Sequence, residues 1–101
     1  MPEHPLANIE DLDSRLFEVV DENRKLAFAE GELPLKHKIL IALALDASHG
    51  AVDGVRSLAR FALRTGASKR EIAETLRVTQ YISGVGSIYT ASRAIKELFG
   101  D

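Results

Sequence analysis

The side chains most able to do chemistry gather where a strongly apolar run ends. Ile39 to Leu45 is apolar without a break, and Asp46, Ser48 and His49 follow it directly. An imidazole can accept a proton near neutral pH, so His49 is a candidate general base that Asp46, one helical turn earlier, could orient. The same residues also suit a helix C-terminus, where His49 would favour the dipole's negative end and Ser48 would bond an upstream carbonyl. The sequence leaves both interpretations open, a catalytic pair or a helix end.

Three arginines form a basic stripe on the next predicted helix, because Arg56, Arg60 and Arg64 recur at four-residue spacing. Like charges at this spacing repel by about a few tenths of a kcal/mol each, so acidic groups should offset them. Asp53, the carboxylates of the first helix or an anionic ligand could do so. Arg56, Asp53 and Ser48 are therefore candidate substrate-binding residues around the turn at 50–54. The alternative is a solvated or subunit-bridging face.

The elements that must position these groups are all helices. Apolar residues recur at helical spacing, and no stretch alternates with a period of two, which predicts an all-α fold. Asn8 is the expected N-cap of the first helix, and Gly31 its end. Ser68 and Glu71 form a capping box that opens the fourth. The five predicted helices span about residues 9–30, 34–49, 52–65, 69–83 and 86–99.

Composition and charge exclude several classes of protein. The 101 residues predict one domain over 1–101, and a formal net charge of −2 gives no broad attraction to nucleic acid or to an anionic membrane. No apolar run reaches the roughly 18–20 residues of a membrane span, and the first five residues lack a signal-peptide pattern, so we expect a cytoplasmic protein. The absence of cysteine excludes thiolate chemistry. His4, His37 and His49 show no metal-ligand spacing, so we expect no metal or other cofactor.

Residues 63–79 suggest a remote alternative, a helix-turn-helix module that binds nucleic acid. A turn at Thr65–Ser68 precedes a helix of suitable pattern. Against this interpretation, no glycine marks a second turn, and no basic recognition helix follows. We therefore expect no nucleic-acid partner and no membrane partner.

The apolar run from Ile39 to Leu45 also bears on assembly. A helix that is apolar on every side must be covered on every side. A chain of this size struggles to provide that cover alone. We therefore expect a homo-oligomer.

Four segments together resemble the carboxymuconolactone decarboxylase family, which includes the AhpD-type alkylhydroperoxidases. The segments are Leu33–Lys36, Leu40–Ala44, Ala62–Leu76 and Tyr81–Gly84. The resemblance covers about residues 33–95, and its most specific element is the turn at 66–68 with Glu71-Ile72 behind it. It implies a small five-helix orthogonal bundle of the AhpD-like type that assembles into a trimer or a hexamer.

The chain departs from this family at its functional positions. By the resemblance, the two cysteines of the peroxidase branch fall on Ala51 and Gly54, its histidine on Leu58 and its glutamate on Ile39. The decarboxylase branch lacks the cysteines but keeps the histidine, so Leu58 departs from both branches. Without a thiol to reduce a peroxide, we expect no thiol-peroxidase activity.

Two hypotheses about function remain. The first is a cofactor-free acid/base decarboxylase or isomerase acting on a small carboxylated substrate, with His49 as base, Asp46 orienting it and Arg56 holding the carboxylate. The second is a catalytically silent family member that acts as an oligomeric binding or scaffold protein. Whether His49 lines a cavity or only ends a helix distinguishes the two.

Overall fold

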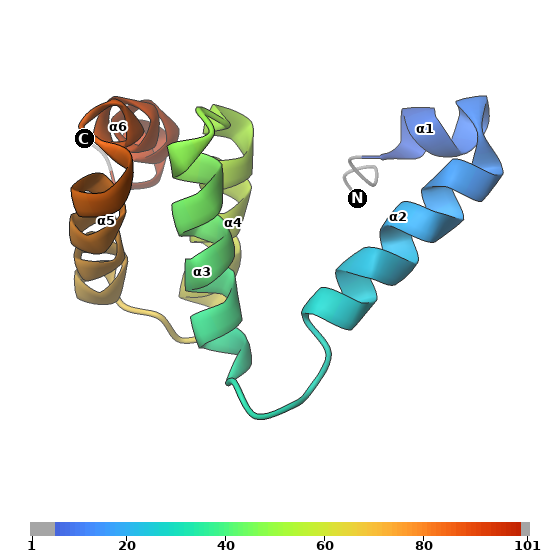
Figure 1. Ribbon diagram of the computed structural model, residues 1–101, viewed down its shortest axis with the longest axis horizontal. Coiled ribbons are helices and arrows are strands. Elements are labelled where there is room, and N and C mark those ends of the chain that lie inside the picture. Colours follow the sequence, from blue (N-terminus) through green and yellow to red (C-terminus); the bar gives the residue numbers. More distant parts are fainter. Residues whose placement is uncertain (1–5, 100–101) are drawn as a thin grey trace. The chain divides into compact units, whose positions relative to one another are not determined.

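The computed structural model describes residues 6–99, so His4 lies outside the described residues. Within that range the chain is all-helical, as predicted, and no strand is present (Figure 1). The helices divide between two compact units, with the boundary between Glu30 and Gly31. Their bounds are α1 Ala7–Leu12, α2 Ser14–Ala27, α3 Leu35–Ser48, α4 Val52–Arg64, α5 Lys69–Ser83 and α6 Gly86–Phe99.

The described residues hold six helices and not five, because the first predicted helix is broken in two. Asp13 adopts an extended conformation (φ −155°, ψ 93°), which ends α1, and its side chain accepts a hydrogen bond from the Leu16 N–H at 3.1 Å. A side-chain cap of this kind starts a new helix, here α2. α1 itself begins at Ala7 with Leu6 as its N-cap, so Asn8 lies inside the helix and its prediction as the N-cap was wrong. Gly31 does not end the helix either, since α2 stops at Ala27.

In the C-terminal unit, α3 is the central helix and packs against α4, α5 and α6. Figure 1 shows α3 and α5 side by side, with α6 seen nearly end-on. The largest fully buried side chains are Ile39 and Leu43 on α3, Val55 on α4 and Ile72 on α5. These residues form the core, and they come from three of the four helices in this unit.

Small side chains complete this core. Ala47, Ala59, Ala62, Ala91 and Ala94 are each at most 1% exposed. A methyl side chain lets neighbouring helix backbones approach closely. The large residues then fill the space that remains between the helices. The unit is thus packed tightly on the inner side of each helix.

The predicted end of the fourth helix is confirmed, since α5 stops at Ser83. Gly84 follows it, and Gly86 begins α6. A Cβ built at either position meets no atom within 4 Å, so no close crossing requires them. Gly84 instead adopts φ +92°, a conformation that side chains with a Cβ rarely adopt, and this allows the chain to turn from α5 into α6.

The predicted capping box at the start of α5 is present with both of its hydrogen bonds. The Glu71 N–H donates to Ser68 Oγ at 3.0 Å, and the Ser68 N–H donates to Glu71 Oε1 at 2.9 Å. The other carboxylate oxygen of Glu71 accepts a hydrogen bond from Lys36 Nζ on α3 at 3.0 Å. The Ser68 N–H first, and then Lys36, lower the pKa of Glu71 below its usual value of 4.5. One carboxylate therefore both caps α5 and ties it to α3.

We expect this carboxylate to make the stability of the fold depend on pH. Because the pKa of Glu71 is lower in the folded state, its contribution is present above pH 4.5 and is lost as the pH falls through the folded pKa. Glu71→Gln should therefore destabilise the protein near neutral pH, and the difference in unfolding free energy from wild type should shrink below pH 4.5. Chemical unfolding followed by circular dichroism between pH 3 and pH 7 measures this difference.

Glu74→Gln is the matched control, because Glu74 lies on the same helix and makes only an exposed pair with Arg70 at 3.6 Å. It should change the unfolding free energy little at any pH. A difference for Glu71→Gln that stayed constant across the pH range would contradict the prediction.

Candidate functional site

His49 lies at the C-terminal end of α3, as the cap residue, and is exposed. Its backbone N–H donates to the carbonyls of Leu45 at 3.1 Å and Asp46 at 3.2 Å. The structure thus places the imidazole at the surface, at the end of the predicted apolar helix. It does not place this imidazole on the wall of an enclosed cavity.

Ser48 bonds an upstream carbonyl, as the helix-end interpretation of the sequence expected. Its Oγ donates to the Leu45 carbonyl at 2.7 Å. This bond uses the hydroxyl proton and leaves the oxygen as an acceptor. Ser48 is the one predicted site residue that also lines the cleft described below.

Asp46 turns towards α4, where its carboxylate lies against the backbone of Gly54. A Cβ built at Gly54 would overlap the carboxylate oxygen of Asp46 and would lie 2.8 Å from its Cγ. Only a glycine leaves room for this contact. The sequence placed candidate substrate-binding residues around 50–54, and in the structure a side chain of the protein itself fills the space beside Gly54.

Arg56 and Asp53 form an ion pair within the first turns of α4. Arg56 Nη1 lies 2.8 Å from Asp53 Oδ1, and the two side chains are 24% and 96% exposed. Asp53 is therefore one of the acidic groups that the arginine stripe was expected to need. Further along the stripe, the Arg64 guanidinium lies 5.8 Å from the centre of the Phe61 ring, and Arg60 is exposed.

Three of the four positions that correspond to the family's functional residues lie on α4 or at its N-cap, and the fourth lies on α3. Ile39 is fully buried in the core, Ala51 is the N-cap residue of α4, and Gly54 and Leu58 lie on that helix. None of these four side chains can carry a proton, donate electrons or bind a metal. Among the described residues, no group of three histidine, cysteine, aspartate or glutamate side chains could hold a metal ion.

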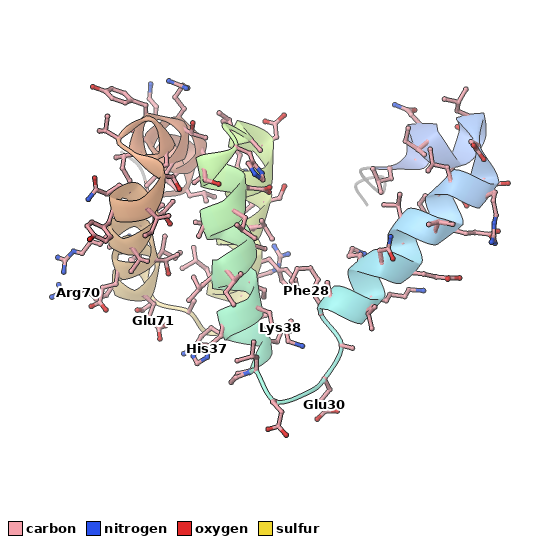
Figure 2. All side chains as sticks on the ribbon, in the orientation of Figure 1. Phe28, Glu30, His37, Lys38, Arg70 and Glu71 are labelled. Atoms are coloured by element: carbon pink, nitrogen blue, oxygen red, sulfur yellow. The ribbon has the colours of Figure 1, made fainter. Side chains whose placement is uncertain are left out.

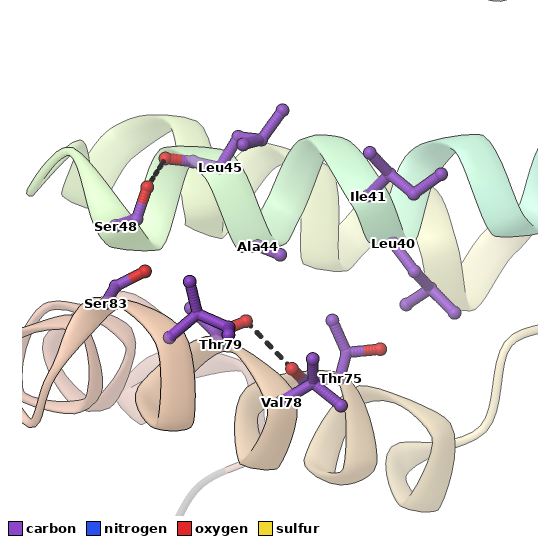
Figure 3. Close-up of a pocket in the computed structure, with 10 residues that line it drawn as sticks. Leu40, Ile41, Ala44, Leu45, Ser48, Thr75, Val78, Thr79 and Ser83 are labelled. Carbon is purple, nitrogen blue, oxygen red and sulfur yellow. Dashed lines mark hydrogen bonds between the residues drawn. The ribbon is translucent and has the colours of Figure 1, made fainter.

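The concave feature of the C-terminal unit is a cleft of about 370 Å³ between α3 and α5 (Figure 3). We call it the α3–α5 cleft. Its lining is mostly apolar, with a few hydroxyl groups. Residues of α3 and α5 line it: Leu40, Ile41, Ala44, Leu45, Ser48, Thr75, Val78, Thr79, Ile82 and Ser83.

The threonine hydroxyls in this cleft already donate their protons to the helix backbone. Thr75 Oγ1 donates to the Glu71 carbonyl and Thr79 Oγ1 to the Thr75 carbonyl, each at 2.8 Å. No acidic, basic or imidazole side chain belongs to the cleft lining. The cleft can therefore cover an apolar surface and accept hydrogen bonds, but it presents no group for acid/base catalysis.

Sequence reasoning missed the α5 side of this cleft. Val78 and Ile82 recur at helical spacing, and they are 66% and 75% exposed. Spacing alone does not show whether such a pair meets the core or solvent, and only their exposed fractions place it at the surface. Figure 2 draws the side chains of α5, with Arg70 and Glu71 labelled at its start.

Comparisons with known proteins add one finding. The model of the carboxymuconolactone decarboxylase family matches residues 14–97, which is most of the chain. Comparison with curated proteins and comparison with solved structures give no match. No helix among the described residues is long and apolar enough to cross a membrane.

The contact between Asp46 and Gly54 generates a prediction about stability. Gly54→Ala should destabilise the protein by about 1–2 kcal/mol, because the new methyl group displaces the Asp46 carboxylate. In an Asp46→Ala background the same change should stabilise it by about 0.5–1 kcal/mol, the ordinary gain of alanine over glycine in a helix. Thermal or urea unfolding of the four proteins of this double-mutant cycle measures the reversal. Equal effects in the two backgrounds would show that the contact is absent.

Proposed function

The chain belongs to the carboxymuconolactone decarboxylase family, and we propose that it is a catalytically silent, self-associating binding protein of that family, without thiol-peroxidase chemistry. The observation that carries this proposal is the composition of the α3–α5 cleft. Its lining holds apolar groups and hydroxyls and no side chain that can transfer a proton. A surface of this kind binds other apolar surfaces.

The placement of the family's functional positions supports the same proposal. Ala51, Gly54 and Leu58 stand where the peroxidase branch carries its two cysteines and its histidine, and the chain contains no cysteine at all. Peroxide reduction by a thiol needs a thiolate that forms a sulfenic acid. This chain has no residue that can take that role.

Exposed apolar side chains support self-association. Ile41 and Leu45 on α3 are 50% and 55% exposed, and Val78 and Ile82 on α5 are more exposed still. Covering one such side chain contributes about 1.5–3 kcal/mol. A cluster of four along one cleft is more than a monomer usually leaves in water. We propose that these residues lie at the contacts of a homo-oligomer, a trimer or a hexamer.

We expect light scattering at micromolar concentration to give the mass of a trimer or a hexamer. Ile82→Asp should shift the protein towards the monomer of 11.1 kDa, because a carboxylate would be buried at the contact without a partner. Ala73→Asp is the matched control: Ala73 is exposed, and its position on α5 faces away from the cleft residues. It should leave the mass unchanged. A wild-type mass of 11.1 kDa would overturn the proposal.

The second candidate is a cofactor-free acid/base enzyme of the decarboxylase or isomerase type. The observation in its favour is that His49 is open to solvent and that Asp46 lies one turn before it at the same helix end. In this candidate His49 is the base, and Arg56, Asp53 and Ser48 contact a small carboxylated substrate.

His49→Asn tests this candidate. If His49 is the base, the change should remove any release of CO₂ from carboxymuconolactone. It should lower the unfolding free energy by at most about 1 kcal/mol, because the structural role of His49 is limited to the end of α3. Turnover by the wild type that survives this substitution would exclude His49 as the base. Absence of turnover in the wild type would favour the silent member.

A further inference from the structure

The N-terminal helices present an apolar surface that nothing in their own unit covers. We call residues 6–30, which hold α1 and α2, the arm. Neither helix contains a buried residue. On α2, Leu16, Val19 and Val20 are 46%, 41% and 38% exposed, and Leu26 is 77% exposed. We call these four residues the arm stripe.

Two short helices without a buried side chain do not hold their structure unaided. Helices of this length are marginal in water, and most helical stability in proteins comes from burial of an apolar face. The arm stripe therefore needs a complementary surface. Its residues recur at positions 16, 19, 20 and 26, which is the pattern of a helix that lies in an apolar groove.

The charges of the arm and of the C-terminal unit are opposite. Residues 6–30 contain seven aspartates or glutamates and three lysines or arginines, a net charge of −4. Residues 31–99 contain six acidic and ten basic residues, a net charge of +4. Opposite net charges favour contact between the two surfaces and disfavour contact between two arms.

The α3–α5 cleft is about as long as the arm stripe. Residues Leu40–Ser48 and Thr75–Ser83 form its walls, and nine helical residues extend about 13 Å. The stripe from Leu16 to Leu26 extends about 15 Å. The lining of the cleft is apolar apart from a few hydroxyl groups, so it suits the apolar side chains of the stripe.

We propose that the arm stripe of one copy of this chain docks in the α3–α5 cleft of a second copy. The opposite net charges of the arm and of residues 31–99 favour this occupant, and the exposed apolar side chains of the two cleft walls are those that the proposed self-association covers. Each copy carries one stripe and one cleft, so head-to-tail docking fills every stripe and every cleft when the rotation between copies closes a ring, as the proposed trimer or hexamer requires. The inference rests on the proposed self-association and names the contact that produces it.

Engineered cysteines test the contact directly, because the chain has none of its own. Val19→Cys places a thiol on the arm stripe, and Val78→Cys places one on the cleft wall. The two single variants, one carrying a mass tag, are mixed in full-length form and oxidised at micromolar concentration. Val19→Cys mixed with Ala73→Cys is the control pair, and the melting curve of each variant establishes that it is folded.

We expect the disulfide between Val19→Cys and Val78→Cys chains to form on the order of 100-fold faster than that of the control pair, because docking raises the local thiol concentration to the millimolar range. Equal rates for the two pairs, in a wild-type protein that is oligomeric, would overturn this inference and leave the proposed self-association in place. A monomeric wild type would overturn both. An intrachain disulfide alone, in a chain that carries both substitutions, would show that the arm covers its own cleft and would also overturn the inference.

Discussion

The C-terminal unit depends on the burial of one side of α3. Ile39 and Leu43 are fully buried, and Ala47 is 1% exposed, so this side of the helix is where α4, α5 and α6 meet. Each of the other three helices also turns buried side chains inward, Val55 on α4, Ile72 on α5 and Ala91 on α6. The removal of α3 would leave none of them with a complete core.

The same constraint explains why a cleft exists. A helix that is apolar on all sides needs neighbours on all sides, and three partners cover only part of its circumference. Ile41 and Leu45 remain about half exposed on the side that α4 and α6 do not reach. The cleft with α5 is therefore a consequence of an apolar helix in a unit too small to surround it. Its apolar character follows from that origin, and so does its suitability for association between chains.

The polar residues near the end of α3 bond mainly within the fold, and of the predicted site residues only Ser48 also lines the cleft. Asp46 occupies the space that Gly54 leaves on α4, Ser48 bonds the helix backbone, and Asp53 pairs with Arg56. Lys36 and Glu71 link the other end of α3 to the start of α5. Apart from the exposed His49, these side chains are thus engaged at both ends of the central helix, while the lining of the cleft between α3 and α5 holds no acidic, basic or imidazole side chain.

The sequence by itself determined the helices of the C-terminal unit and the family. Local signals were sufficient there, because the capping box at Ser68 and Glu71 acts within one helical turn and the glycine at 84 acts on its own backbone. The same kind of local signal misplaced the start of the N-terminal helices. Asn8 and Asp13 look equally suited to cap a helix in the sequence, but only Asp13 is a cap, and its extended backbone separates α1 from α2.

Only the tertiary structure decided what the candidate residues touch. Periodicity places Val78 and Ile82 on one face of α5, but whether that face meets the core or water depends on how α5 sits against α3. In the same way, the sequence places Asp46 beside His49 on one helix. The approach of α4 then turns the aspartate towards Gly54 and leaves the histidine in solvent. Contacts between helices depend on the orientation of whole elements, and the spacing of residues within one helix carries no information about that orientation.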